Sequence, residues 1–431
     1  MMTAKAGISP GHHFLQIAFL ALLVVVPTAF ALITWHFPIM HTASIPILGG
    51  EILMILVLGL SFLETDGAVR PPEGWNLAAG LLLIATGVAG AVLNAPFPGD
   101  SLLFLFRTVA HIALAALLFQ ALAAHWRDFA KPIVHAVLFG ALFQIAFSYF
   151  VIAHGALTGE IEWKIFMAGA SNVRQLSFIG IVVAGISAGL AARSPGGKHF
   201  LVCCLGVVIG LTFLDLNGGR AGIVAGLGAV GLAALLSAPD KRLRNAFSFL
   251  ACFAASVPLS MIYVPPNDSW GFLRTIKTLF GSNELGVSSP GRTLLWGIAY
   301  ERFLDHPFVG NGEGQFRFFY QAGQVRFNHP HNVIVQSLFQ WGAIGTICAA
   351  FLFARPFLRI RAAIRTSPEV AIPAFCAVAG LSAMAVLDGS LYYTYPTMTS
   401  VVLVVLIAVS AESRNRTASC SVIRADDASV A

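Results

Sequence analysis

Long apolar runs, separated by short polar turns, follow one another along most of the chain. A helix that crosses the roughly 30 Å of hydrocarbon in a bilayer needs about 20 predominantly apolar residues. About twelve runs approach this length, near residues 14–34, 47–63, 75–94, 101–124, 132–153, 175–192, 199–216, 221–238, 245–264, 332–354, 370–387 and 397–411. The pattern therefore predicts an all-α polytopic membrane protein with about 12 transmembrane helices.

The amino-acid composition supports a membrane protein. Hydrophobic residues make up 57% of the chain and charged residues only 11%, whereas about a quarter of the residues in soluble domains are charged. The net charge of +6 favours contact with anionic membrane lipids. No nucleic-acid-binding module is visible in the sequence, so nucleic acid is not an expected partner. Of the six cysteines, only Cys420 lies outside the predicted spans, so a disulfide framework is not expected.

The distribution of Lys and Arg predicts the orientation, because short cytoplasmic loops are enriched in both. If the N-terminus is cytoplasmic, most of the 26 Lys and Arg residues fall on the inside, and the short outer loops hold only Lys164, Arg174 and Arg220. Both termini are therefore predicted to be cytoplasmic. The first apolar run is as long as a full span and is interpreted as a retained helix.

One long polar segment, from Pro265 to His331, interrupts the series on the predicted outer side. Within it, Trp270–Phe280 and Arg292–Leu304 have apolar residues at helical spacing and basic residues on the other face, which predicts interfacial amphipathic helices. Aromatic residues between Phe308 and Phe327 favour a folded loop. The predicted organisation is transmembrane helices 1–9 in residues 1–264, an outer loop domain in 265–331, helices 10–12 in 332–411 and a cytoplasmic tail in 412–431.

The end of this loop carries the first candidate for chemistry, because two histidines and an asparagine stand where the loop meets an apolar helix. A histidine at a membrane surface can stay neutral near physiological pH and accept a proton from a hydroxyl. His331 is therefore the candidate catalytic base, with His329 and Asn332 as supporting residues. Two other roles for His331 remain open, namely packing at the helix end and metal binding together with His329. A metal site would need further ligands, and the nearby carboxylates follow no ligand spacing, so neither a metal nor a cofactor is expected.

Three arginines stand where an outer turn meets a predicted helix, namely Arg174, Arg220 and Arg292. Arg220 follows Asn217 and two glycines, and a guanidinium beside free backbone N–H groups can hold a phosphate through paired hydrogen bonds. Arg292 follows a Pro-Gly turn, where a cation at a helix N-terminus opposes the macrodipole and suggests an anionic partner. Alternatively, Arg220 reaches lipid headgroups and Arg292 is simply solvated.

Three further polar residues lie close to or within the predicted spans. Asp388, at the outer end of span 11, either orients the imidazole, binds sugar or is a solvated loop residue. Arg107 and His111 are one helical turn apart within span 4. Because intramembrane charge generally faces the bundle interior, Arg107 either joins the anion site or pairs with a carboxylate.

Together these motifs resemble the O-antigen ligase and polymerase superfamily. The resemblance rests on Arg220 in its Gly-Gly-Arg turn, on Arg292 in the long loop, and on His331-Asn332 followed by nine residues, Gly342, two residues, Gly345 and Thr346. It is specific between Asn217 and Thr346, and the pattern after His331 is more similar to the ligases than to the polymerases.

The resemblance implies a GT-C-like helical fold and an inverting, metal-independent glycosyltransferase. Such an enzyme transfers a glycan from undecaprenyl pyrophosphate to a sugar hydroxyl on lipid A-core, at the periplasmic face of a bacterial inner membrane. It implies pyrophosphate binding by Arg220, Arg292 and Arg174, and proton abstraction from the acceptor by His331. The supporting residues would be His329, Asn332, Asn217 and Asp388. Sugar would be bound by outer aromatic residues such as Trp163, Tyr320, Tyr392, Tyr393 and Tyr395.

Other activities fit parts of the same pattern. An O-antigen polymerase or a protein O-oligosaccharyltransferase would use the same lipid-linked donor with a different acceptor. A transporter of lipid-linked glycans would also have many helices, but it predicts paired ionisable groups at mid-membrane and repeated halves. The chain instead concentrates its polar groups at one outer surface. The glycine-rich spans 6 to 8 would either line an access route for the lipid tail or serve close helix packing.

Overall fold

The computed structural model of the chain describes residues 10–36, 45–63, 74–124, 126–158, 176–262, 271–280, 285–322 and 325–428. The helices are α1 (Pro10–His36), α2 (Ile45–Leu63), α3 (Gly74–Leu93), α4 (Pro98–Ala124), α5 (Ala130–Thr158), α6 (Ser177–Arg193), α7 (Gly197–Asn217), α8 (Arg220–Leu235), α9 (Pro239–Met261), α10 (Gly271–Phe280), α11 (Leu285–Asp305), α12 (Val333–Leu358), α13 (Ile360–Thr366), α14 (Pro368–Asp388) and α15 (Thr394–Ala428). Short 3₁₀ helices lie at Arg127–Phe129, Phe316–Phe318 and Ser390–Tyr392, and β1 (Gln321–Ala322) pairs antiparallel with β2 (Val325–Arg326).

The predicted spans correspond one by one to apolar helices. Among the described residues, nine helices are long and apolar enough to cross a membrane, namely α1, α3, α4, α5, α7, α9, α12, α14 and α15. The shorter apolar helices α2, α6 and α8 occupy the remaining predicted spans. The prediction of an all-α polytopic membrane protein is therefore confirmed. Helices α10 and α11 lie where the sequence predicted amphipathic helices.

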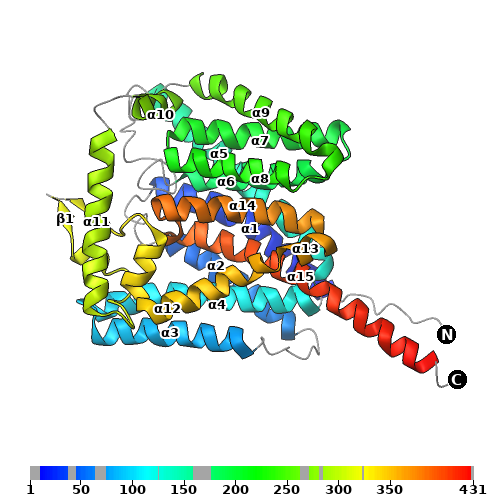
Figure 1. Cartoon of the computed structure of the whole chain (residues 1–431), viewed down its shortest axis with the longest axis horizontal. Coiled ribbons are helices and arrows are strands. Elements are labelled where there is room, and N and C mark those ends of the chain that lie inside the picture. The colour runs from blue at the N-terminus through cyan, green and yellow to red at the C-terminus, as the bar shows by residue number, and fades with distance from the viewer. Residues whose placement is uncertain are drawn as a thin grey trace.

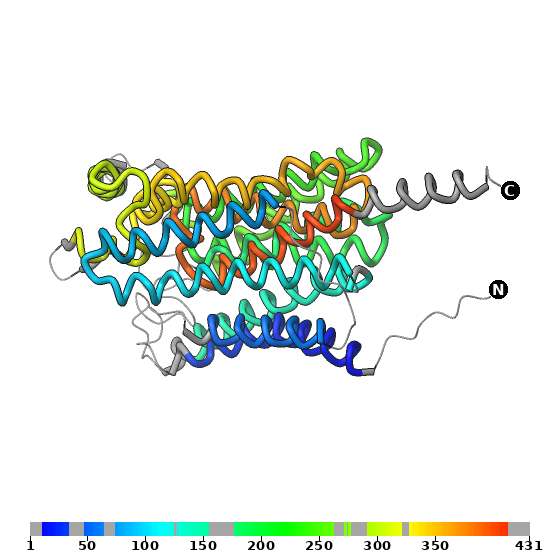
Figure 2. The backbone as a smooth tube through the Cα atoms, turned by 90° about the horizontal axis from the view of Figure 1, so that it is seen from below, coloured from blue at the N-terminus to red at the C-terminus, as the bar shows by residue number. Residues whose placement is uncertain are grey.

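Most helices run side by side, whereas α11 lies across one end of the bundle (Figure 1). The chain between α11 and α12 lies at this same end. The beginning of α1 lies at the opposite end (Figure 2). The loop that carries the candidate histidines thus lies at the opposite end of the bundle from the beginning of α1.

Helix α6 forms the centre of the bundle, and all of its residues except Arg193 are buried. Its small residues permit very close packing on neighbouring helices. A Cβ on Gly185 would lie 2.8 Å from the Cα atom of Ala377 in α14, and a Cβ on Gly210 of α7 would lie 2.9 Å from the Cβ of Ala184 in α6. The glycines of α6 and α7 therefore serve helix packing, and α6 has no face left to line an access route from the lipid.

A second, smaller hydrophobic core holds the segment between α11 and α12 in place. Leu295 and Ala299 of α11 and Phe316 of the loop are buried against Phe339 of α12. The rings of Phe316 and Phe319 each meet the ring of Phe339 edge-on, with centroids 5.5 and 5.6 Å apart. This core agrees with the expectation of a folded loop, since aromatic edge-to-face pairs add to the stabilisation from burial.

Helix α12 is interrupted at Gly342, the first glycine of the motif that follows His331. Its φ of 64° and ψ of −169° break the helical backbone. Loop residues 307–312 pack against this break, where the Asn311 N–H donates to the Phe339 carbonyl at 2.8 Å. A Cβ at position 342 would collide with the Phe308 carbonyl group. Glycine is required here for both its backbone conformation and the close approach of the loop.

We expect Gly342→Ala to lower the free energy of unfolding by about 1–3 kcal/mol, because alanine must adopt a strained backbone and displace the loop. The matched control is Gly228→Ala in α8, where no atom lies within 4 Å of an added Cβ. That variant should be as stable as the parent or slightly more so, because alanine favours helix. Thermal unfolding in detergent measures both variants, and an unchanged midpoint for Gly342→Ala would contradict the requirement for glycine.

Candidate active site

The backbone at His331 has an unusual conformation. Among the described residues, His331 is the one non-glycine residue with positive φ, at 57°. Its N–H donates to Nδ1 of His329 at 3.1 Å. The next residue, Asn332, is the N-cap of α12, and its Oδ1 accepts from the N–H groups of Ile334 and Val335 at 2.9 and 3.1 Å. Asparagine is a preferred N-cap, so Asn332 favours the start of α12 at this point.

His329 is more deeply buried than His331, with only 3% of its surface exposed. Its ring stacks on the ring of Tyr392 at a centroid distance of 4.8 Å. Because Nδ1 accepts the His331 N–H, Nε2 carries the proton and donates to the hydroxyl of Tyr393 at 3.1 Å. Burial holds the pKa of His329 well below its usual value of 6.5, and the nearby His331 and Arg292 lower it further. His329 is therefore neutral, and both of its ring nitrogens are engaged.

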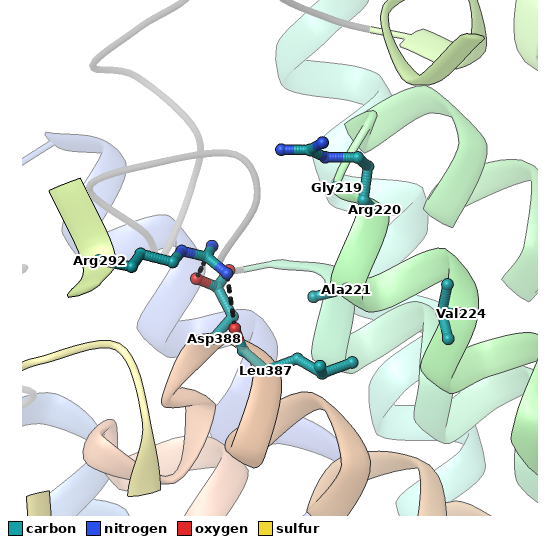
Figure 3. Close-up of a pocket in the computed structure, with 7 residues that line it drawn as sticks. All are labelled: Gly219, Arg220, Ala221, Val224, Arg292, Leu387 and Asp388. Atoms are coloured by element: carbon teal, nitrogen blue, oxygen red, sulfur yellow. Dashed lines mark hydrogen bonds and ion pairs between the residues drawn. The ribbon is translucent and has the colours of Figure 1, made fainter. Parts of the chain in front are cut away.

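Asp388 connects His331 to Arg292. The distance from Oδ1 of Asp388 to Nδ1 of His331 is 3.5 Å, and the same oxygen lies 2.8 Å from Nη2 of Arg292. Arg292 also donates through Nη1 to the Leu387 carbonyl at 2.7 Å (Figure 3). The His331 side chain is 31% exposed, so its ring remains accessible from the surface. The carboxylate can hold Nδ1 of the imidazole, which leaves Nε2 for an acceptor.

Arg220 and Arg292 border one cavity of about 280 Å³. Its lining residues are Gly219, Arg220, Ala221, Val224, Arg292, Leu387 and Asp388. The two arginine side chains reach toward this space from opposite sides, and Leu387 extends toward α8 below them (Figure 3). Val224 is 61% exposed and Leu387 is 40% exposed, so the cavity is continuous with the apolar outer surface of the bundle. The cavity therefore has a cationic part, formed by Arg220 and Arg292, and an apolar wall, formed by Val224 and Leu387.

The local sequence explains how Arg220 reaches this cavity. Helix α7 ends at Asn217, Gly218 adopts a left-handed conformation with a φ of 59°, and α8 begins at Arg220. Arg292, in contrast, does not stand in the first turn of its helix as predicted, because α11 already begins at Leu285. The predicted opposition between the Arg292 cation and the helix macrodipole is therefore absent. The charge that Arg292 contacts in the structure is instead the carboxylate of Asp388.

Asn217, a predicted site residue, does not line the described cavity. Asn217 is fully buried at the end of α7, and its amide atoms have no hydrogen-bond partner among the described residues. Arg174 lies outside the described residues, as does Trp163. The structure therefore brings together Arg220, Arg292, Asp388 and the His329–Asn332 segment.

The prediction that the outer aromatic residues bind sugar is wrong for two of them. Tyr392 is 4% exposed and stacks under His329, and Tyr395 is 7% exposed with its ring edge-on to Phe178 at 4.9 Å. Both residues pack inside the protein because the turn after Asp388 folds inward. Tyr320 and Tyr393 remain partly exposed.

Arg107 pairs with a carboxylate and does not line the cavity. Its Nη1 donates to the Tyr392 carbonyl at 2.8 Å, and Nη2 lies 3.9 Å from Glu313. Glu313 is buried and accepts hydrogen bonds from Thr108 and Trp341, both at 2.9 Å. Burial raises the pKa of Glu313, whereas Arg107 lowers it. Arg107 thus holds the backbone of Tyr392, the residue on whose ring His329 stacks.

Sequence reasoning missed the role of Glu313 in this network. A signal was present, because Glu313 stands in an alternating run with Gly310, Gly312 and Gly314, all of which have positive φ. Such a run marks a backbone that turns tightly against its neighbours. His111, the other residue of uncertain role, pairs with the buried Glu51 of α2 at 2.7 Å.

The metal alternative for His331 gains no support from the geometry. No group of three or more His, Cys, Asp or Glu side chains within the described parts of the chain is placed to hold a metal ion. His329 would be the second ligand of a histidine pair, but its two ring nitrogens already bond to Tyr393 and to the backbone of His331.

One family model matches part of the chain. The family model described as O-Antigen ligase matches residues 205–350. The matched range holds Arg220, Arg292 and His331, together with the outer loop. No curated protein matches the chain. Over residues 205–350, the chain is therefore similar to the O-antigen ligase family, which agrees with the resemblance seen in the sequence.

Proposed function

We propose that the protein is an O-antigen ligase of lipopolysaccharide biosynthesis with a GT-C-like fold. It transfers O-antigen polysaccharide from undecaprenyl pyrophosphate to a sugar hydroxyl of lipid A-core, with inversion at the anomeric carbon. The observation that carries this proposal is the cavity between α8, α11 and α14, where two arginines face an apolar wall next to His331. Such a cavity fits a charged headgroup on a hydrocarbon chain.

The donor would bind with its pyrophosphate between Arg220 and Arg292. Each guanidinium can form two parallel hydrogen bonds to phosphate oxygens. The polyprenyl chain would leave the cavity along Val224 and Leu387 and remain in the membrane lipid, where it needs no aqueous path. Arg174, which lies outside the described residues, is proposed as a third cation for the same group.

The acceptor hydroxyl would bind next to Nε2 of His331. Nε2 takes the proton of the acceptor hydroxyl while the oxygen attacks the anomeric carbon of the donor sugar, and Asp388 holds the Nδ1 side of the ring. The bond from that carbon to the pyrophosphate oxygen breaks, and its electron pair leaves with the pyrophosphate. Because pyrophosphate is a good leaving group, the arginines can stabilise its charge without a metal ion or other cofactor.

The positive-inside distribution supports a periplasmic site in the bacterial inner membrane. If the beginning of α1 lies on the cytoplasmic side, the end of the bundle that carries α11 faces the periplasm (Figure 1, Figure 2). Residues 1–264 would then carry helices 1–9, residues 265–331 the periplasmic loop domain, residues 332–411 helices 10–12, and residues 412–431 a cytoplasmic tail. The apolar spans contact membrane lipids, and no nucleic acid is involved.

The test is reconstitution of the purified protein with undecaprenyl-pyrophosphate-linked glycan and lipid A-core, with chelator and without added metal. We expect glycan on the acceptor lipid, detected by a mobility shift and mass spectrometry. Glycan elongated on its own carrier would instead identify a polymerase. Transfer to an added protein acceptor would identify a protein O-oligosaccharyltransferase, and movement of the donor across vesicles without any transfer would identify a transporter.

A further inference from the structure

The left-handed backbone of His331 must be held by its surroundings. A non-glycine residue pays a conformational penalty there, and such strain persists only where the fold over-determines it. The direct restraint is the hydrogen bond from the His331 N–H to Nδ1 of His329, at 3.1 Å. Trp296 adds a second restraint on the same segment by donating through Nε1 to the Pro330 carbonyl at 2.9 Å.

His329 is itself held rigidly, so it can serve as a fixed acceptor. Its ring is stacked on Tyr392 and bonded to Tyr393. Gly389, with a φ of 67°, approaches it so closely that an added Cβ would lie 2.9 Å from Nδ1. The ring therefore cannot turn without moving the segment that also carries Asp388.

We propose that His329 is a positioning residue, which sets the direction of the His331 ring by accepting the His331 backbone N–H. The proposal rests on the proposed function, in which His331 is the base. A side-chain acceptor bonded to the N–H two residues later is the geometry of an Asx-turn, which asparagine forms readily. The Nδ1 atom of histidine and the Oδ1 atom of asparagine are both attached to Cγ, so asparagine can supply the same acceptor.

The neutral form of His329 is essential to this role, because a proton on Nδ1 would abolish the acceptor. The titratable or charged groups next to it are His331, Arg292, Tyr392 and Tyr393. Burial lowers the pKa of His329, and the nearby His331 and Arg292 lower it further. Since an unfolded histidine protonates below about pH 6.5, the folded site loses stability as the pH falls below that value.

Two substitutions separate the acceptor from the packing of the ring. His329→Phe keeps a ring on Tyr392 but removes the acceptor, whereas His329→Asn keeps the acceptor and removes the ring. We expect His329→Phe to lower kcat about 100-fold, which is the typical effect of displacing a catalytic group by about 1 Å. The KM for the donor should stay unchanged, because Arg220 and Arg292 are untouched. His329→Asn should retain at least about a tenth of the parent kcat, by the same principle.

A second readout does not depend on activity. Hydrogen–deuterium exchange of the peptide spanning residues 327–333 should be faster in His329→Phe and close to that of the parent in His329→Asn. If His329→Phe has a kcat at least as high as that of His329→Asn and its peptide exchanges no faster, ring packing is what matters and the proposal is overturned. If the parent transfers no glycan, the proposed function fails, while the exchange rates still decide whether His329 holds the His331 backbone.

Discussion

His331→Ala is expected to lower the rate of glycan transfer by about 10²–10⁴-fold, the usual effect of removing a positioned general base. In the structure, Asp388 lies on the Nδ1 side of the imidazole at 3.5 Å, and the ring is partly exposed. Nothing else beside the cavity can replace it as a base, among the described residues, because His329 is buried and Asp388 is already paired with Arg292. Initial rates in the reconstituted system, at saturating donor and acceptor, measure the effect.

A matched control is His306→Ala. His306 directly follows α11 and does not line the cavity, so the rate should stay within about two-fold of the parent, as for a substitution away from the chemistry. Monodispersity in detergent confirms that each variant is folded. Full activity of a well-folded His331→Ala variant would remove His331 from the mechanism and return it to the packing role.

The spans were predictable because hydropathy over about 20 residues is a local property. The central position of α6 was not, because apolar residues face both lipid and neighbouring helices in a bilayer. For the same reason, the glycines of α6 and α7 did not reveal from the sequence whether they line an access route or pack against helices. Their role depends on which helix lies opposite, and only the tertiary structure shows the contact with α14.

The residues of the candidate site were predictable where their side-chain chemistry and their immediate neighbours in the sequence were enough to identify them. Arg220 and His331 each stand where a turn meets a helix, which the sequence indicates directly, whereas Arg292 lies inside α11, which begins at Leu285. The pairing of Asp388 with both Arg292 and His331 joins three distant segments, so its geometry required the structure. Tyr392 and Tyr395 were assigned wrongly because an aromatic residue beside a predicted outer turn can face either solvent or the core, and its neighbours decide.

Arg292→Gln and Arg220→Gln are each expected to lower kcat by about 10²–10³-fold, the typical effect of removing one charge-stabilising donor. Both guanidinium groups border the cavity from opposite sides (Figure 3), and charge on the leaving pyrophosphate increases as its bond to the sugar breaks. Arg292→Lys should recover only part of the rate, because an ammonium keeps the charge but lacks the planar pair of donors.

Arg302→Gln is the matched control for these substitutions, since Arg302 lies on the same helix α11, pairs with Asp305 at 3.1 Å and does not line the cavity. Its kcat should stay within about two-fold of the parent, as for other surface changes. The division between kcat and KM decides what the arginines do. A loss confined to the donor KM would mean that they hold the pyrophosphate equally in the ground state and the transition state, and it would contradict their role in stabilising the leaving group. A loss in kcat that is shared by Arg220→Gln and Arg292→Gln but absent from Arg302→Gln would support charge stabilisation by these two arginines, because only they border the cavity that the donor is proposed to occupy.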